Sequence, residues 1–363
     1  MKSLIEIENN KKSAIACRFE FVDSLRGFLI ICVVLHHTSL WALGVDYMKT
    51  YHHYYMQFFM PLFFLISGFV SYKDIKGLKK IKVFRKLLGK FRIMVFMATL
   101  FLIIQSLIIG HGWRDIVSDI FSGGGKYWFT YVLFNCIVLL DLFWICSGFV
   151  GMSDGFKTKF LLVISLLFYP FTMLFDNIAP IAGISQSIVS LFLFLGGVNL
   201  KFFTFYSIGA LLRKHWDFFE NKFITSSFLP ICILIYFTSN IIDAVFSVRY
   251  GIIYTITSFS GSIVVFSFFY RYQYVFSKAT IIGNMLQYLG KRTLDIYWLH
   301  YFFIPYSLLT IYPNIGLEKV PLLEIVCSFI LATLVVCASL IVSAILRSSS
   351  VLGYYIFGAK KNK

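Results

Sequence analysis

The sequence predicts an all-α integral membrane protein with about ten transmembrane helices and both termini in the cytoplasm. Of its 363 residues, 59% are hydrophobic and only 14% are charged, and the mean hydropathy is +0.80. Soluble domains of this length do not have such a composition. Ten apolar windows, bounded by charged or turn residues, account for the expected helices.

The first half of the chain contains five expected spans. They run approximately over Ser24–Leu43, Tyr54–Tyr72, Ile93–Gly110, Trp128–Val150 and Phe160–Phe175. The loop Lys73–Arg92 between the second and third spans is strongly basic and contains one acid, Asp74. An acidic residue, Asp141, lies within the fourth span, where an unpaired charge is costly.

The second half contains five more expected spans. They run approximately over Phe202–Leu212, Phe223–Ser239, Tyr250–Tyr270, Thr293–Leu309 and Leu322–Leu346. The region Asp176–Lys201 is apolar but interrupted by proline and glycines. Two interpretations are open for it: a re-entrant or interfacial segment before the sixth span, or one long broken helix that includes that span.

The distribution of basic residues predicts the orientation. Ten spans place both termini on one side of the membrane, and most of the 33 Lys and Arg residues then fall on that side. The opposite side receives six: Lys49, Arg114, Lys126, Lys201, Arg249 and Lys319. This asymmetry predicts cytoplasmic termini and explains the net charge of +16 by topology and attraction to anionic membrane lipid, so we expect no nucleic-acid partner.

Other features exclude several classes of protein. The seven cysteines show no paired spacing, so we expect neither disulfides nor a metal site. The start of the chain lacks the apolar segment and cleavage site of a signal peptide. No HExxH or carboxylate-pair motif is present, which argues against a metalloprotease and a glycosidase.

The stretch FVDSLRGFLIICVVLHHTSLW, residues 21–41, carries the strongest functional signal. On a helix, the eleven residues from Arg26 to His37 return to within about 20° of the same face, about 16 Å along the axis. Asp23, three residues before Arg26, is placed to pair with the guanidinium. His36 points about 100° away from His37.

Two interpretations of this stretch compete. Arg26 can be a positive-inside anchor, and a buried histidine can be a packing residue. Ionisable groups at membrane depth cost about 2.5–3.5 kcal/mol on insertion scales, however, and usually serve a function. An arginine at the membrane surface and an imidazole deeper on the same line favour a path for a polar substrate.

Four segments, in order, resemble the membrane-bound acyltransferase 3 family. They are DSLRGFLIICVVLHH in the first span, MPLFFLISGF (Met60–Phe69), YWFTYVLF (Tyr127–Phe134) and LGKRTLDIYWLH (Leu289–His300), with a weaker match at FYSIGALL (Phe205–Leu212). The resemblance covers nearly the whole chain. It implies three parts: a cytoplasmic N-terminal segment (1–20), an acyltransferase-3-like transmembrane domain (21–346) and a basic cytoplasmic tail (347–363).

The resemblance implies an O-acyltransferase of the bacterial inner membrane. Such proteins transfer acyl groups, usually acetyl, from cytoplasmic acyl-coenzyme A to hydroxyls of glycans such as lipopolysaccharide O-antigen or exopolysaccharide, or to lipid-linked sugars. Acetyl-CoA is then a co-substrate, and no cofactor is permanently bound. The arginine and histidine of the family's first motif fall on Arg26 and His37, and His36 falls outside it. Basic residues after the second span bind the nucleotide end of coenzyme A; the candidates here are Arg85, Lys86, Lys90 and Arg92, without the proline that often follows them.

Acyl transfer from a thioester needs an activated hydroxyl, a bound thioester and donors for the developing oxyanion. A free imidazole has a pKa near 6.5, so neutral His37 suits the role of general base; a covalent acyl-histidine relay is the alternative. Arg26 suits the phosphates of coenzyme A, because guanidinium binds them bidentately, and Asp23 would orient it. The basic loop can also be only an anchor on anionic lipid.

Two further residues are candidates for supporting roles. His300 either faces the same cavity as His37 or hydrogen-bonds a neighbouring helix. It does not share a helix face with Asp295, five residues earlier. Asp141 is a candidate polar partner in the cavity.

The main rival function is a transporter or exporter of a glycan or small metabolite, with Arg26 and His37 as substrate or proton sites. The absence of an internal repeat counts against many transporter folds. The sequence leaves open the acceptor sugar, the acyl chain, the side of modification and the oligomeric state.

Overall fold

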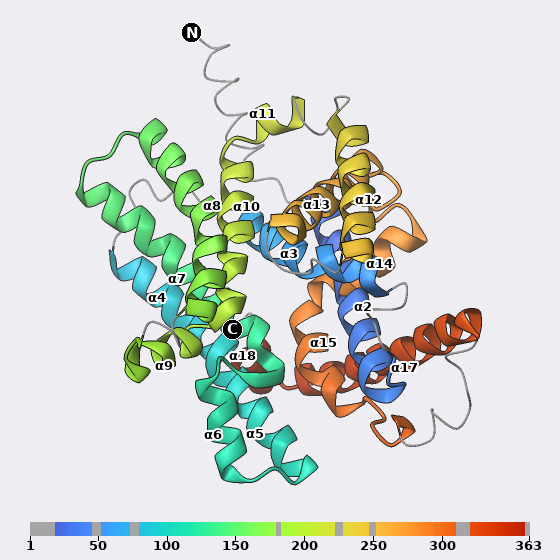
Figure 1. Ribbon diagram of the computed structural model, residues 1–363. Coiled ribbons are helices and arrows are strands. Elements are labelled where there is room, and N and C mark those ends of the chain that lie inside the picture. Colours follow the sequence, from blue (N-terminus) through green and yellow to red (C-terminus); the bar gives the residue numbers. More distant parts are fainter. Residues whose placement is uncertain are drawn as a thin grey trace.

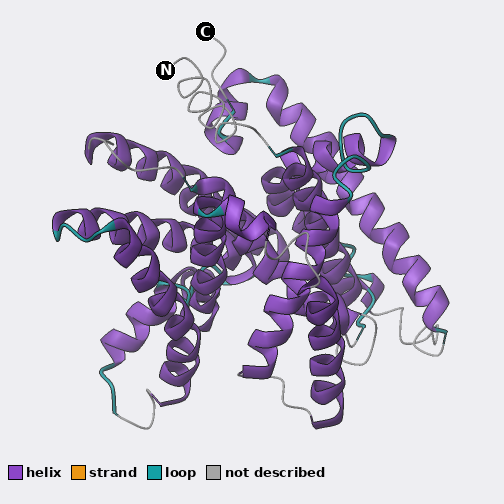
Figure 2. Cartoon of the chain, turned by 90° about the horizontal axis from the view of Figure 1, so that it is seen from above, coloured by secondary structure: helices purple, strands orange, loops and turns teal. Residues whose placement is uncertain are grey.

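The computed structural model describes residues 19–45, 52–72, 80–178, 183–221, 228–246, 252–309 and 320–359. Helices joined by loops and turns make up all of this part of the chain, and it contains no strand (Figure 2). The predicted all-α class is therefore confirmed. Most of the N-terminal segment, part of the basic loop with Asp74, and Lys49, Arg249 and Lys319 lie outside the described residues.

Figure 1 shows the arrangement of the helices along the chain. In the first half they are α2 (Glu20–Ala42), α3 (His52–Ser71), α4 (Lys80–Phe91), the π-helix η1 (Arg92–Phe96), α5 (Met97–Ile109), α6 (Trp113–Phe121), the 3-10 turn η2 (Gly125–Tyr127), α7 (Trp128–Phe149) and α8 (Asp154–Ile178). In the second half they are α9 (Gln186–Phe194), η3 (Gly197–Phe202), α10 (Phe203–Lys214), α11 (Trp216–Phe219), α12 (Phe228–Phe246), α13 (Ile252–Arg271), α14 (Ile281–Lys291), α15 (Thr293–Leu299), η5 (His300–Phe302), α17 (Pro321–Ser348) and α18 (Ser350–Phe357).

Within the described residues, 7 helical stretches are long and apolar enough to cross a membrane. They are Glu20–Ala42, Tyr54–Ser71, Val83–Ile109, Trp113–Phe149, Asp154–Thr172, Ile253–Arg271 and Leu322–Ser348. The bent pair Ile188–Phe194 and Gly197–Lys214 makes 8 if it is one span. The protein is thus a multi-pass membrane protein, and the count of about ten spans and the side of the termini stay predictions.

Two expected elements take a specific form. The interrupted region before the sixth span contains α9, which meets η3 and α10 at a bend of 57°. Gly196 and Gly197 lie at this bend with φ values of 118° and 52°, which side chains disfavour. The expected helix Thr293–Leu309 is wrong in its length: α15 ends at Leu299, and Pro305, which has no N–H to donate, lies in the irregular segment beyond η5.

Glycines bring the central helices into close contact. A Cβ on Gly27 of α2 would lie 2.0 Å from the Leu286 carbonyl oxygen of α14, and one on Gly290 would lie 1.8 Å from the carbonyl oxygen of Asp23. The same arrangement joins α3 to α10, where a Cβ on Gly68 would meet the carbonyl oxygen of Tyr206 at 1.8 Å. Small residues at such crossings let backbones approach closely in membrane proteins.

Buried ionic contacts join α15 to α17. Arg347 donates from Nε and Nη2 to the two carboxylate oxygens of Asp295 at 2.7 and 2.8 Å, and the Ser343 hydroxyl donates to the same carboxylate at 2.6 Å. Asp295 is 1% exposed. These bonds hold α15, which carries Tyr297 and leads directly into His300, against a long neighbouring helix.

Candidate active site

The structure brings two histidines that are distant in sequence into direct contact. His37 Nδ1, on α2, lies 2.9 Å from His300 Nε2, at the start of η5. Their rings are nearly parallel, at 6°, and Trp41 stacks on the His37 ring at a centroid distance of 4.7 Å. His300 is fully buried. Of the two roles open to His300, the hydrogen bond to a neighbouring helix is the one observed, and its partner is His37 itself.

The hydrogen-bond chain determines which nitrogen of each ring carries hydrogen. His300 Nδ1 lies 3.0 Å from the carbonyl oxygen of Ile296, which can only accept, so Nδ1 is the donor. In a neutral His300 ring, Nε2 is then an acceptor and receives the hydrogen of His37 Nδ1. His37 Nε2 is left with a free lone pair, as a general base requires.

A cavity of about 180 Å³ lies beside this pair. We call it the histidine cavity; its lining residues come from α2, α3, α7, η3, α13 and α15 and are Val33, His36, His37, Met56, Phe59, Met60, Trp128, Phe129, Phe202, Tyr254 and Tyr297. Pockets for drug-sized ligands measure about 300–1,000 Å³, so this smaller cavity suits the reacting end of a substrate.

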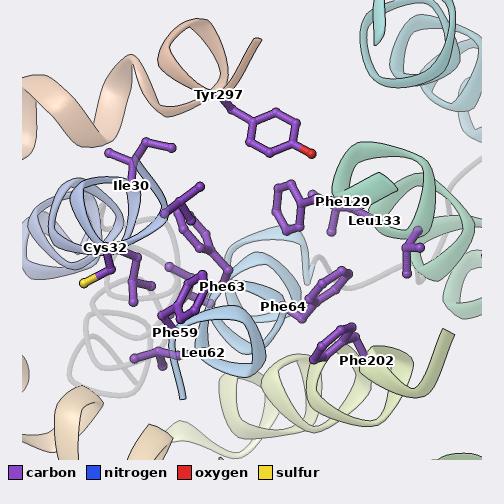
Figure 3. Packing of buried hydrophobic residues seen from close by; sticks show 14 of the residues in the cluster. Ile30, Cys32, Phe59, Leu62, Phe63, Phe64, Phe129, Leu133, Phe202 and Tyr297 are labelled. Atoms are coloured by element: carbon purple, nitrogen blue, oxygen red, sulfur yellow. The ribbon is translucent and has the colours of Figure 1, made fainter. Parts of the chain in front are cut away.

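Aromatic packing shapes one wall of this cavity (Figure 3). The Tyr297 ring packs against Phe129 at 5.4 Å, and the Tyr297 hydroxyl donates to the carbonyl oxygen of Lys126 at 3.3 Å. Figure 3 shows this hydroxyl directed toward α7. On the other side of α3, Phe202 stacks on Phe64 at 4.9 Å. These contacts fix α15 and η3 around the histidines.

His36 also lines the cavity, although it lies outside the Arg26–His37 stripe. Its ring centroid is 5.4 Å from that of His37 and 6.0 Å from that of Phe59 on α3. The histidine cavity therefore extends around α2 far enough to reach two side chains that point about 100° apart. Helical periodicity alone could not show this, because it depends on where the neighbouring helices leave space.

Arg26 and Asp23 lie on α2 toward its N-terminal end, as expected. Arg26 is half-buried and Asp23 is 7% exposed. Their predicted ion pair stays a prediction. The backbone of Asp23 contacts Gly290 of α14, so this end of α2 is tightly packed.

A candidate coenzyme A ligand, Lys86, pairs with Asp141, the candidate polar partner in the cavity. Lys86 of α4 donates to both carboxylate oxygens of Asp141 on α7, at 3.1 and 2.9 Å. The side chain of Asp141 is 8% exposed and that of Lys86 is 35% exposed. The candidate polar partner of the cavity is thus the counter-ion of a candidate coenzyme A ligand, and neither residue lines the histidine cavity.

The other basic candidates differ in their surroundings. Arg92, the first residue of η1, lies over the Tyr354 ring at 4.3 Å and donates to the carbonyl oxygen of that residue at 3.3 Å. Helix α18 therefore covers Arg92. Arg85 is exposed and Lys90 is half-buried, both on α4. Among the residues that the structure describes, no group of three or more His, Cys, Asp and Glu is placed to hold a metal ion.

Comparison with known proteins agrees with this architecture. A family model described as an acyltransferase domain, Acyl_transf_3, matches residues 19–344. No curated protein and no solved structure shows a significant match. The multi-pass helical fold and this match define a membrane acyltransferase. The chain belongs to the acyltransferase 3 family.

Proposed function

We propose that the protein is an O-acyltransferase of the bacterial inner membrane. It moves an acetyl group from cytoplasmic acetyl-CoA to a hydroxyl of a cell-surface glycan or its lipid-linked precursor. The observation that carries the proposal is the hydrogen-bond chain from Ile296 through His300 to His37, beside an otherwise largely apolar cavity. It presents a basic imidazole nitrogen where bulk water is scarce, which strengthens its interactions with a bound hydroxyl.

In the proposed reaction, the acceptor hydroxyl binds in the histidine cavity and gives its proton to His37 Nε2. Its oxygen attacks the thioester carbonyl, the C–O bond forms, and the C–S bond breaks. The proton on His37 then passes to the departing thiolate of coenzyme A, so that charges balance. His300 is a positioning residue here, because it fixes the tautomer and ring orientation of His37 and stabilises the imidazolium that forms.

Arg26 would bind a phosphate of coenzyme A near one end of α2. Eleven residues of helix separate it from His37 by about 16 Å, a length that the pantetheine arm can span. Arg85 is the first candidate for the nucleotide end because it is exposed, and Lys86, Lys90 and Arg92 are available if their present contacts open.

The test compares acyl groups on surface glycans by mass spectrometry in wild type, a deletion strain, and strains that express His37→Ala or His111→Ala at equal level. His111 is an exposed histidine between α5 and α6 and serves as the matched control. We expect ester-linked acetyl to be lost in the deletion and with His37→Ala, and retained with His111→Ala.

Unchanged acylation in the deletion strain would overturn the proposal. If glycan export or a metabolite gradient collapsed at the same time, the protein would instead be a transporter. A mass shift other than that of acetyl would support an acyltransferase that uses a different acyl-CoA as its donor.

A further inference from the structure

A buried lysine adjoins the histidine cavity, and acyl transfer as described leaves it without a role. Lys201 is the fifth residue of η3, at the bend between α9 and α10, and is 8% exposed. The positive φ values of Gly196 and Gly197 produce this bend and turn the 3-10 segment into the bundle. Lysines are almost never so deeply buried unless they are paired.

The ammonium of Lys201 is surrounded by aromatic rings. Its Nζ lies 5.1 Å from the ring centroid of Tyr254, 5.6 Å from that of Phe202 and 5.9 Å from that of Tyr169. Within the described part of the chain it makes no ion pair and no hydrogen bond. Ring faces attract a cation, but they do not replace an anion for a charge taken out of water.

Two of these three rings line the histidine cavity. Phe202 and Tyr254 face the same hollow as His36 and His37. The Lys201 ammonium therefore lies against two side chains of the cavity wall, one from η3 and one from α13, although Lys201 is not itself a lining residue. The donor's phosphates already have candidate partners on α2 and α4, so the charge at the cavity is available to the second substrate.

We propose that Lys201 recognises an anionic group, a carboxylate or a phosphate, on the acceptor. The proposal rests on the proposed acyltransferase function and specifies its substrate class. When the acceptor binds, its anion pairs with the ammonium and its hydroxyl is directed toward His37. Lys201 is thus a specificity-determining residue, and neutral acceptors leave its charge buried without a partner.

The experiment uses the purified full-length protein, acetyl-CoA, and glycan isolated from the deletion strain as the acceptor. Transfer is measured with wild type, Lys201→Met, Lys201→Arg and a control, Lys159→Met, in which an exposed lysine of α8 is neutralised. We expect Lys201→Met to raise the KM for glycan at least tenfold while the KM for acetyl-CoA is unchanged. The KM of Lys201→Arg for glycan should stay within about threefold of the wild-type value. The KM of Lys159→Met for glycan should equal that of wild type.

A second arm changes the acceptor instead of the protein. The carboxylates of the glycan are amidated in one sample, and its phosphates are removed enzymatically in another. One treatment should raise the KM for wild type at least tenfold and leave Lys201→Met unaffected, and that treatment identifies the anion. If the doubly treated glycan is as good an acceptor for wild type as untreated glycan, the proposal is wrong.

The results of these measurements distinguish a failure of anion recognition from a failure of the proposed acyltransferase function. Equal effects of Lys201→Met and Lys201→Arg on both KM values, or on kcat alone, would assign Lys201 a packing role and overturn anion recognition while acyl transfer stands. Transfer that is absent from wild type would overturn the acyltransferase and this assignment together, whereas wild-type transfer that Lys201→Met leaves unchanged would overturn anion recognition alone.

Discussion

His300 is joined to His37 by a hydrogen bond of 2.9 Å and to the carbonyl oxygen of Ile296 by a second of 3.0 Å. The carbonyl can only accept, so the direction of both hydrogen bonds follows for neutral rings. These directions place the hydrogen of His37 on Nδ1 and leave the lone pair on Nε2. A residue 263 positions away thus sets the protonation pattern of the proposed base.

Removal of His300 should lower the rate without abolishing it. Positioned proton transfer contributes about 10²–10⁴-fold. We expect His300→Ala to lower kcat by about 10²-fold, less than His37→Ala, with KM values little changed. His300→Gln, whose side-chain oxygen can accept from His37 Nδ1, should recover part of the loss. Steady-state kinetics would show this, and a His300→Ala enzyme as slow as His37→Ala would mean that His300 takes a direct chemical part.

Methyl groups added at the crossing of α2 and α14 should prevent stable folding. Gly27→Ala and Gly290→Ala each place a Cβ within 2.0 Å of a backbone carbonyl oxygen that cannot move alone. We expect both variants to lose most folded protein in detergent, measured by fluorescence size exclusion and thermal unfolding. The matched control is Gly89→Ala on α4, where a Cβ meets nothing within 4 Å. It should be neutral or stabilising by up to about 1 kcal/mol, because alanine favours helix more than glycine does. Normal folding of Gly27→Ala would show that α2 and α14 are not so closely packed.

The sequence predicted the parts of the site that lie on one helix. The spacing of Arg26 and His37 on a single apolar stretch follows from helical periodicity, and α2 forms over that stretch. The partner of His37 could not be predicted, because the choice of His300 depends on how α15 and η5 pack beside α2. The role of Gly27, Gly68 and Gly290 at helix crossings could not be predicted either, because it depends on which carbonyl of the neighbouring helix lies against each glycine.

The charged residues show a different limit. The sequence shows the positive charge in the loop after the second span and the cost of Asp141 at membrane depth. It does not show that Lys86 pairs with Asp141, because hydropathy indicates which segments cross the membrane but not which helices are neighbours. The aromatic surroundings of Lys201 could not be predicted from the sequence, because they come from α8, η3 and α13, which are separated in sequence.

The pair Asp295–Arg347 should behave as one unit. Removing one partner of a buried pair costs about 3–5 kcal/mol, because the other charge is left uncompensated. We expect Asp295→Asn and Arg347→Met each to lower the thermal stability strongly. The double variant should be less destabilised than the sum of the two. Arg347→Lys should not restore wild-type stability, because an ammonium cannot make both bonds of the guanidinium fork. Additive effects in thermal unfolding would contradict a coupled pair, and retained stability in Arg347→Met would show that Ser343 and Arg292 suffice for Asp295.

Variants of Lys86 and Asp141 can show whether the basic helix α4 serves to neutralise Asp141 or to bind the acyl donor. If Lys86 serves mainly to neutralise Asp141, Lys86→Ala and Asp141→Asn should lower stability to a similar extent, with coupling in the double variant. The lysine is 35% exposed, so we expect about 1 kcal/mol. Neither variant should then change the KM for acetyl-CoA. Arg85→Ala, which removes an exposed charge from the same helix, should instead raise that KM if α4 receives the nucleotide, with no effect on stability. A rise in the KM for acetyl-CoA with Lys86→Ala but not with Asp141→Asn would show that the lysine leaves its carboxylate to bind the donor.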